Sequence, residues 1–207
     1  MTENSATLER ILETAEKEFM DKGFQGASLR NIVKMAGVTT GAFYRYFSTK
    51  EALFEALVKP HAEYVKTLFT QAVRRIEEIP SEKQAQSMTE VSSDCLEQML
   101  DYVYAHFDRF KLLICSSYGT VYENFIHDIV ELEVDSTYRF ISAMESIGLK
   151  IPDVDRDLCH MISSGLFSGI FEMVIHDMDH EQARRRVRQL KEFYTGGWER
   201  LMGISFG

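Results

Sequence analysis

Residues 37–51 read GVTTGAFYRYFSTKE, and this stretch decides the fold of the amino-terminal part of the chain. Gly37 allows the backbone to reverse, and either of the two threonines that follow it can cap a short helix. In that helix Phe43 and Phe47 lie four residues apart and therefore share one face. Two short helices joined at a glycine turn are typical of a helix-turn-helix.

The residues on either side of this stretch predict the helices that complete such a domain. Upstream, residues 5–22 carry apolar side chains at three- and four-residue spacing, and Gly23 provides a stop. Ser28 then caps a second short helix. Downstream, Ser48 and Glu51 have the spacing of a capping box that starts the next helix. We therefore expect three helices around one small core.

The whole chain of 207 residues favours an all-α fold. It contains three prolines, is 45% hydrophobic, and has no run of alternating β-branched residues. We expect a tri-helical helix-turn-helix domain over residues 1–59 and a second helical domain over 60–207, with Pro60 near the boundary. The second domain is expected to contain helices at about 61–78, 82–107, 108–117, 120–147, 154–178 and 181–203.

The net charge of −9 hides an uneven distribution. Residues 59–207 hold sixteen Lys and Arg against twenty-four Asp and Glu, whereas residues 22–50 hold five cations and no acidic residue. Neutralisation of phosphates supplies much of the affinity of proteins for DNA. An acidic body with one basic segment therefore agrees with a nucleic-acid contact at the predicted helix-turn-helix.

The outer face of the helix that begins near Thr39 carries small or hydrogen-bonding residues. With Phe43 turned inward, Thr40, Gly41, Tyr44 and Arg45 face outward. A glycine costs a helix about 1 kcal/mol relative to alanine, so we expect Gly41 to permit a close approach. Lys50 and Arg30 lie in first helical turns, where cations are disfavoured, and the sequence suggests that a bound anion compensates them.

The segment SLRNIVKMAGVTTGAFYRYFSTKEALFEAL resembles the DNA-binding domain of the tetracycline-repressor-like (TetR) family of transcriptional regulators. The resemblance covers roughly residues 5–58. It includes the pattern G-V-x-x-G-x-x-Y-x-x-F-x-x-K-E-x-L, filled by Gly37, Val38, Gly41, Tyr44, Phe47, Lys50, Glu51 and Leu53.

The resemblance implies an all-helical protein with an amino-terminal DNA-binding domain and a carboxy-terminal ligand-binding and dimerisation domain. It implies phosphate contacts for Thr39, Thr40, Tyr44 and Lys50, and base contacts for the recognition helix, with Arg45 the candidate for reading guanine. The expected DNA-binding residues are Ser28, Arg30, Thr39, Thr40, Gly41, Tyr44, Arg45 and Lys50.

Aromatic and methionine residues are frequent after residue 60. Each can be ordinary core, but the group suits a pocket for a mostly apolar ligand. The candidate pocket residues are Tyr64, Met99, Tyr102, Phe110, Tyr118, Tyr122, Phe125, Phe140, Met161 and Phe167.

Two helices near the carboxyl end are candidates for a dimer interface. Small residues four apart let helix backbones approach closely, and aromatic residues recur on the last helix. The expected interface residues are Gly165, Ser168, Gly169, Tyr194 and Trp198. The basic run at 184–188 is interpreted as a solvated face, with a second DNA contact as the alternative.

Several other functions are not indicated by the sequence. No catalytic motif and no cofactor motif occurs, so we expect neither an enzyme nor a cofactor. His176 and His180 have metal-compatible spacing but also fit a helix end, and we expect no metal there. Three widely spaced cysteines, no signal-peptide pattern and no apolar run of about 18 residues predict a cytoplasmic protein with no membrane partner.

The sequence thus predicts a homodimeric regulator, expected to be a repressor, that binds a palindromic operator and is released by a small, mostly apolar effector. Two alternatives stay open. One is a DNA-binding regulator without an effector, and the other is an all-helical carrier or enzyme with an incidental helix-turn-helix.

Overall fold

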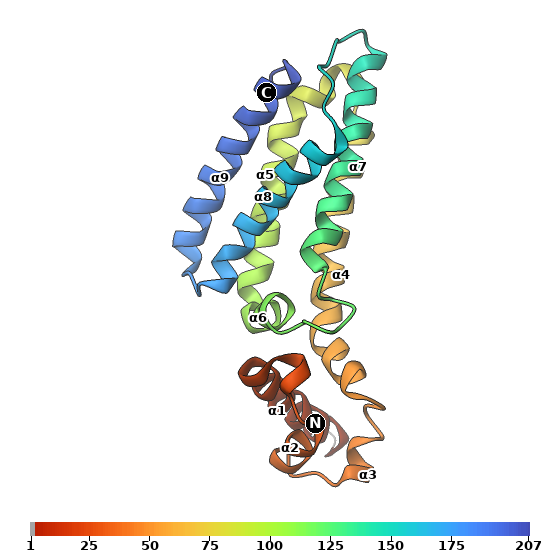
Figure 1. Ribbon diagram of the computed structural model, residues 1–207, viewed down its shortest axis with the longest axis vertical. Helices are drawn as coiled ribbons and strands as arrows, with labels where there is room; N and C mark the ends of the chain where they lie inside the picture. The colour runs from red at the N-terminus through yellow and green to blue at the C-terminus, as the bar shows by residue number, and fades with distance from the viewer. Residues whose placement is uncertain (1–2) are drawn as a thin grey trace. The chain divides into compact units, whose positions relative to one another are not determined.

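The computed structural model describes residues 3–207, which form nine helices and no strand (Figure 1). The all-α class is therefore confirmed. The helices are α1 (Glu3–Gly26), α2 (Leu29–Met35), α3 (Thr40–Phe43), α4 (Lys50–Glu77), α5 (Ser81–Ala105), α6 (Phe107–Cys115), α7 (Phe125–Ser146), α8 (Arg156–Ile175) and α9 (His180–Met202).

These helices form two compact units. Unit 1 contains the chain up to Glu63 together with His106–Phe125, and unit 2 contains Tyr64–Ala105 together with Ile126–Gly207. The sequence alone assigns everything after residue 59 to the second domain, whereas the structure groups α6 with the amino-terminal helices. The reason is that α6 and the loop after it bind α1: the Phe24 amide donates to the Ser116 carbonyl at 2.9 Å.

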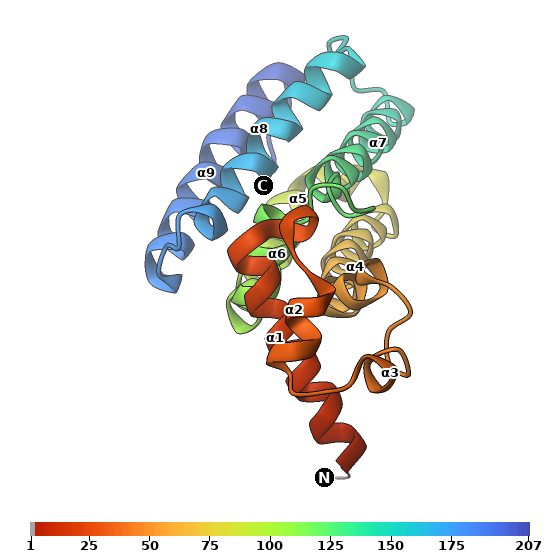
Figure 2. The same ribbon diagram turned by 60° about the horizontal axis from the view of Figure 1, so that its bottom comes forward.

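The core of unit 1 consists largely of aromatic rings. Phe19 of α1 packs edge-on against Phe54 of α4, with ring centroids 5.1 Å apart, and Phe24 folds back to contact both rings. Phe43 and Phe47 are buried as predicted, but α3 ends at Phe43, so Phe47 lies beyond the helix in which it was expected. Aromatic pairs add about 0.5–1.5 kcal/mol each beyond the burial of their area. This small core holds the short helices α2 and α3 (Figure 2).

Glycine sets both turns that separate the first three helices. Gly23 has φ +67°, which breaks the regular helix near the end of α1, and Gly37 has φ +66° between α2 and α3. Both conformations are strained for any residue with a Cβ atom. The predicted reversals are therefore present at these positions.

The start of α4 differs from the expected capping box. Thr49, not Ser48, caps the helix, because its hydroxyl accepts from the Ala52 amide at 3.0 Å. Pro60 lies inside α4, which continues to Glu77. A proline in a helix interior removes one backbone hydrogen bond. The helix also carries the chain from unit 1 into unit 2 just after Pro60.

Unit 2 consists of long helices, with α8 and α9 side by side (Figure 1). The close approach occurs at glycines: a Cβ atom on Gly165 would lie 2.4 Å from the Tyr194 hydroxyl, and one on Gly169 would lie 3.0 Å from the Leu190 side chain. Gly165 and Gly169 of α8 thus leave room for the side chains of Tyr194 and Leu190 of α9 in the same chain.

By length and composition alone, one described helix, α8, could cross a membrane. The sequence predicts no apolar run of about 18 residues, whereas the 20-residue helix α8 is long and apolar enough to meet this criterion. Core helices of soluble proteins meet the same criterion, and α8 is partly buried within unit 2.

Candidate nucleic-acid interface

The candidate interface begins with the exposed side of α3. Thr39 caps this helix, with its hydroxyl 3.1 Å from the Ala42 amide. Phe43 is buried, whereas Thr40, Gly41 and Arg45 are exposed and Tyr44 is 55% exposed. The inward and outward faces therefore agree with the division that the sequence predicts.

Nothing inside the described chain requires a glycine at position 41. A Cβ atom placed on Gly41 would have no neighbour within 4 Å, and its backbone does not have positive φ. Because glycine destabilises a helix by about 1 kcal/mol relative to alanine, Gly41 is unfavourable for folding. The residue leaves a backbone surface of α3 open to an external partner.

Lys50 is held by the protein itself, which corrects the inference that only a bound anion compensates its charge. Its Nζ donates to the carbonyls of Gln25 and Ala27 at 3.3 and 3.2 Å, and it lies 4.6 Å from the Phe24 ring centroid. These contacts satisfy the carbonyls that follow the kink in α1. Lys50 is half-buried, so part of the residue remains exposed to solvent.

The amino end of α2 also has an internal partner. The Glu18 carboxylate accepts from the Ser28 amide at 3.1 Å and from the Asn31 side chain at 2.5 Å. Its hydrogen bond with Lys22 lowers the pKa of Glu18 below its ordinary value. Ser28 caps the helix at a long 3.4 Å. A carboxylate of the chain therefore lies at the amino end of α2, but it makes no ion pair with Arg30, and the anion expected beside Arg30 stays a prediction.

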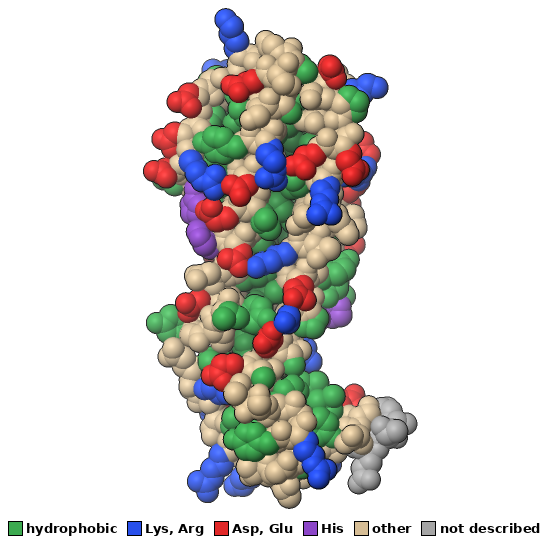
Figure 3. Space-filling view, turned by 90° about the vertical axis from the view of Figure 1, so that its right-hand side faces the viewer, with side chains coloured by type: hydrophobic (Ala, Val, Ile, Leu, Met, Phe, Trp, Pro, Cys, Tyr) green, Lys and Arg blue, Asp and Glu red, His purple; other side chains and the backbone are tan. Residues whose placement is uncertain are grey.

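Three cations of the basic segment remain available. Arg30, Lys34 and Arg45 are exposed, and their side chains make no hydrogen bond or ion pair within the part of the chain that the structure describes. Figure 3 shows Lys and Arg side chains at the end of unit 1 where α2 and α3 lie in Figure 1. Lys34 is not part of the motif, but its exposure makes it an additional candidate for a DNA contact.

A cavity of about 450 Å³ lies within unit 2. Its walls come from α4, α5, α7, α8 and α9, and they are mostly apolar, with Glu133 among the few ionisable groups. Burial raises the pKa of Glu133 to about 7. Ligand sites typically enclose about 300–1,000 Å³ and combine apolar walls with a few polar groups. The size and chemistry of the cavity suit a small, mostly apolar ligand.

The structure brings only part of the predicted pocket set to this cavity. Met99, Phe140 and Phe167 line it. Tyr64 and Tyr102 stack on each other with centroids 3.7 Å apart and do not line the cavity. The other five do not line it either: Phe110, Tyr118, Tyr122 and Phe125 belong to unit 1, and Met161 is 69% exposed on α8. Aromatic content alone could not separate these environments.

The predicted interface residues are divided between internal and external faces. Gly165 and Ser168 are exposed on α8, whereas Gly169 is partly covered by Leu190 of α9. Tyr194 lies over Gly165, and Trp198 packs on a core cluster with Phe140, Met144 and Met202. The exposed apolar residues Met161 and Phe193 were not predicted for this role.

The basic run of α9 has internal partners. Arg184 pairs with Asp101 at 2.6 Å and Arg188 with Glu97 at 3.6 Å. Arg185, Arg186 and Arg188 are exposed, which agrees with the interpretation as a solvated face. His176 pairs with Glu172, whereas His180 pairs with Asp101. These two histidines therefore face different partners and lie at the end of α8 and the start of α9.

Comparison with known proteins agrees with this geometry. Residues 11–57 match the model of the bacterial regulatory proteins of the tetR family. The uncharacterized HTH-type transcriptional regulator YdgC of Bacillus subtilis is 42% identical over 59 residues, which are 28% of this chain and 30% of that protein. The transcriptional repressor AcnR of Corynebacterium diphtheriae is 39% identical over 61 residues, which are 30% and 32% of the two chains.

These curated matches span about a third of the length of the relatives. The fold likeness extends further: a transcriptional regulator of the TerR/AcrR family from Aquifex aeolicus has a TM-score of 0.58 at 21% identity, covering 90% of this chain and 99% of that one. At this identity the likeness shows the all-helical fold. The amino-terminal domain thus matches the tetR family of bacterial regulatory proteins over residues 11–57.

Proposed function

We propose that the protein is a cytoplasmic, homodimeric transcriptional repressor that binds a palindromic operator through unit 1 and is released by a small, mostly apolar effector bound in unit 2. The observation that carries the DNA-binding part is the exposed face of α3, which presents Thr40, Gly41, Tyr44 and Arg45 within the family domain. Phosphate contacts by hydroxyl and cationic groups position such a helix, and base contacts give it specificity.

The cavity favours an effector over the alternative of a regulator without one. A solidly packed unit 2 would have supported a regulator without an effector. An unfilled cavity of about 450 Å³ with mostly apolar walls lowers the stability of the fold, and a bound ligand would fill it. Glu133 is placed to bind a hydrogen-bond donor or basic group of that ligand. We infer an effector with an apolar body and one such group.

The proposed coupling uses the covalent connections between the units. The chain passes between them within α4, between α5 and α6, and at the start of α7. An effector can change operator affinity only if it binds better to one arrangement of these helices than to the other. Pro60, inside α4, is the proposed hinge.

The proposed dimer interface is the exposed face of α8 together with α9. Met161 is 69% exposed and Phe193 is 74% exposed, and Ser168 adds an exposed small residue on α8. Contiguous exposed apolar patches mark interaction sites, and in the proposed interface the Met161 and Phe193 side chains contribute to one such patch. A two-fold dimer presents two reading helices to two half-sites of one operator.

Selection of bound fragments from genomic DNA, followed by titration of the recovered site, tests the proposal. Arg45→Ala should relax the preference at one base pair and cost about 1–3 kcal/mol of binding free energy on the selected site. Arg185→Ala removes the same charge from an exposed position on α9 and serves as the control. Failure to recover any preferred sequence, or equal effects of the two variants, would count against the assignment.

A further inference from the structure

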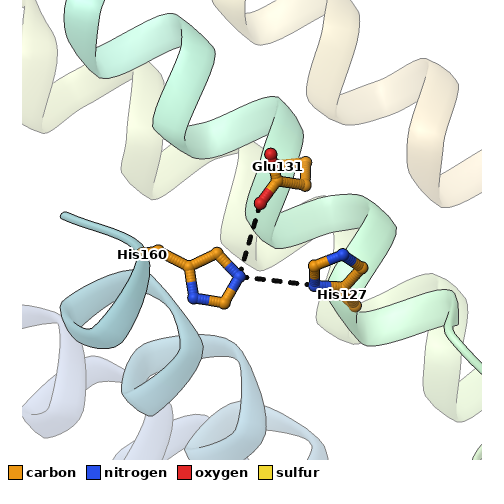
Figure 4. A group of neighbouring side chains, drawn as sticks. All are labelled: His127, Glu131 and His160. Atoms are coloured by element: carbon orange, nitrogen blue, oxygen red, sulfur yellow. Dashed lines mark hydrogen bonds and ion pairs between the residues drawn. The ribbon is translucent and has the colours of Figure 1, made fainter. Parts of the chain in front are cut away.

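Three side chains of unit 2 that are unrelated to the proposed operator contact or cavity converge on one point of its surface. His127 and Glu131 lie one turn apart on α7, and His160 reaches them from α8 (Figure 4). One ligand-type atom from each lies within 4.8 Å of the other two. We propose that His127, Glu131 and His160 form a binding site for a divalent transition-metal ion, with Zn²⁺ as the preferred ion.

The distances within this cluster suit coordination better than direct hydrogen bonding. The His160 Nε2 atom lies 3.3 Å from the His127 Nδ1 atom and 3.3 Å from a Glu131 carboxylate oxygen. A single proton on Nε2 would be shared between two acceptors, both beyond the usual separation of about 2.9–3.0 Å. In a tetrahedral zinc site with bonds of about 2.0–2.1 Å, neighbouring ligand atoms lie about 3.3 Å apart.

Other contacts orient two of the three ligands. The Nδ1 atom of His160 lies 3.4 Å from the Ser164 hydroxyl, which can hold the tautomer that leaves Nε2 free. Arg156 donates to the second carboxylate oxygen of Glu131 at 3.0 Å and to Asp135 at 2.8 Å. Such outer partners fix ligand orientation and commonly affect metal affinity by about 10- to 100-fold.

The ligand set indicates the class of ion. Two imidazole nitrogens and one carboxylate oxygen suit Zn²⁺, and also Co²⁺ or Ni²⁺, whereas Ca²⁺ and Mg²⁺ prefer oxygen ligands. His127 is exposed, and His160 and Glu131 are 35% and 39% exposed, so the ion can enter from solvent and keep water at a fourth position. A bound ion would join α7 to α8 within unit 2.

The test is titration of the tag-free full chain with Zn²⁺ against a chromophoric chelator. We expect one tight site per chain, weakened more than about 100-fold in His127→Ala and in His160→Ala, because each removes one of three ligands. His176→Ala is the matched control, since His176 also pairs with a carboxylate on a helix surface but belongs to no group of three metal-type ligands among the described residues. Circular dichroism of each variant verifies that it is folded.

A second measurement excludes binding by a thiol. Cys115 is an exposed free cysteine, so Cys115→Ser should bind Zn²⁺ as the wild type does, and the Co²⁺ complex should lack a thiolate charge-transfer band. Absence of a stoichiometric site in the wild type would overturn the proposal. So would equal weakening by His176→Ala, or loss of the site in Cys115→Ser.

Discussion

At the scale of single residues, Gly41 and Lys50 differ in whether folding explains their place in the candidate DNA contact. Gly41 has open space around it and no conformational need for glycine, so folding does not explain it. Lys50 has three internal contacts, so folding explains much of it. A match to the motif therefore does not say whether a residue serves folding or DNA binding. The contacts of that residue in the structure are needed to decide between the two roles.

Gly41→Ala should separate stability from DNA binding. We expect the free energy of unfolding to rise by up to about 1 kcal/mol, because alanine favours the helix and its Cβ atom meets nothing within 4 Å. Affinity for the operator should fall, because the added methyl group lies on the exposed side of α3. Chemical denaturation and a DNA titration on the same sample measure both. Lower stability, or unchanged affinity, would contradict this account of the glycine.

Glu133→Gln should change how stability depends on pH. Burial raises the pKa of Glu133 to about 7, so the folded protein holds a proton that the unfolded chain has released above its ordinary pKa of 4.5. The wild type should therefore lose stability relative to the variant as pH rises from about 5 to 7. At pH 8 the variant should be more stable by about 1–3 kcal/mol.

Denaturation of both proteins across this pH range makes the comparison. Because all other ionisable groups are common to the two proteins, the difference isolates Glu133. A constant difference between pH 5 and 8 would show that the carboxyl group of Glu133 does not resist ionisation in the cavity.

At the scale of helices, the short elements of unit 1 depend on contacts from their neighbours. The four residues of α3 are too few to be stable alone, and a buried phenylalanine core and the Thr39 cap hold them. Tyr46, just beyond α3, donates to the Asn4 side chain of α1 at 2.5 Å. The position of the reading helix is thus set by α1 as well as by the turn at Gly37.

Lys50→Met tests the link between α1 and α4. Methionine keeps much of the apolar stem over Phe24 but removes the donor to the Gln25 and Ala27 carbonyls, so we expect a loss of about 1 kcal/mol in stability. If the ammonium also meets a phosphate, operator affinity should fall on all sequences and the salt dependence should flatten by about one unit. Denaturation and DNA titration over several salt concentrations separate the two effects. An unchanged salt slope would leave Lys50 a purely structural residue.

At the scale of the whole molecule, the acidic charge and the exposed apolar residues have separate roles in the proposal. Residues 59–207 carry most of the excess negative charge, which disfavours DNA contact outside unit 1. Met161 and Phe193 interrupt this polar surface on α8 and α9. In the proposed dimer, the two copies meet through these helices and present two half-site readers.

Met161→Glu should weaken dimerisation, because it places a charge in the proposed apolar interface. We expect a monomer in sedimentation at concentrations where the wild type is a dimer, together with loss of tight binding to the palindromic site. Val121→Glu is the control, since Val121 is 86% exposed and belongs to unit 1, outside the proposed interface. A Met161→Glu protein that remains dimeric would place the interface elsewhere.

The sequence by itself determined the all-α class, the glycine turns, the helix-turn-helix and the inward and outward faces of α3. These features follow from local spacing and from the positive φ that Gly23 and Gly37 allow, which neighbouring residues specify without reference to distant ones. The predicted exposed face at Thr40, Gly41, Tyr44 and Arg45 was confirmed for the same reason.

Only the tertiary structure decided which distant side chains meet. It grouped α6 with α1, gave Lys50 and the amino end of α2 internal partners, and separated Met161 and the tyrosines from the cavity. It also brought His160 to His127 and Glu131 across more than twenty residues of sequence. Periodicity identifies the buried face of a helix, but the neighbour that covers this face depends on how the helices pack.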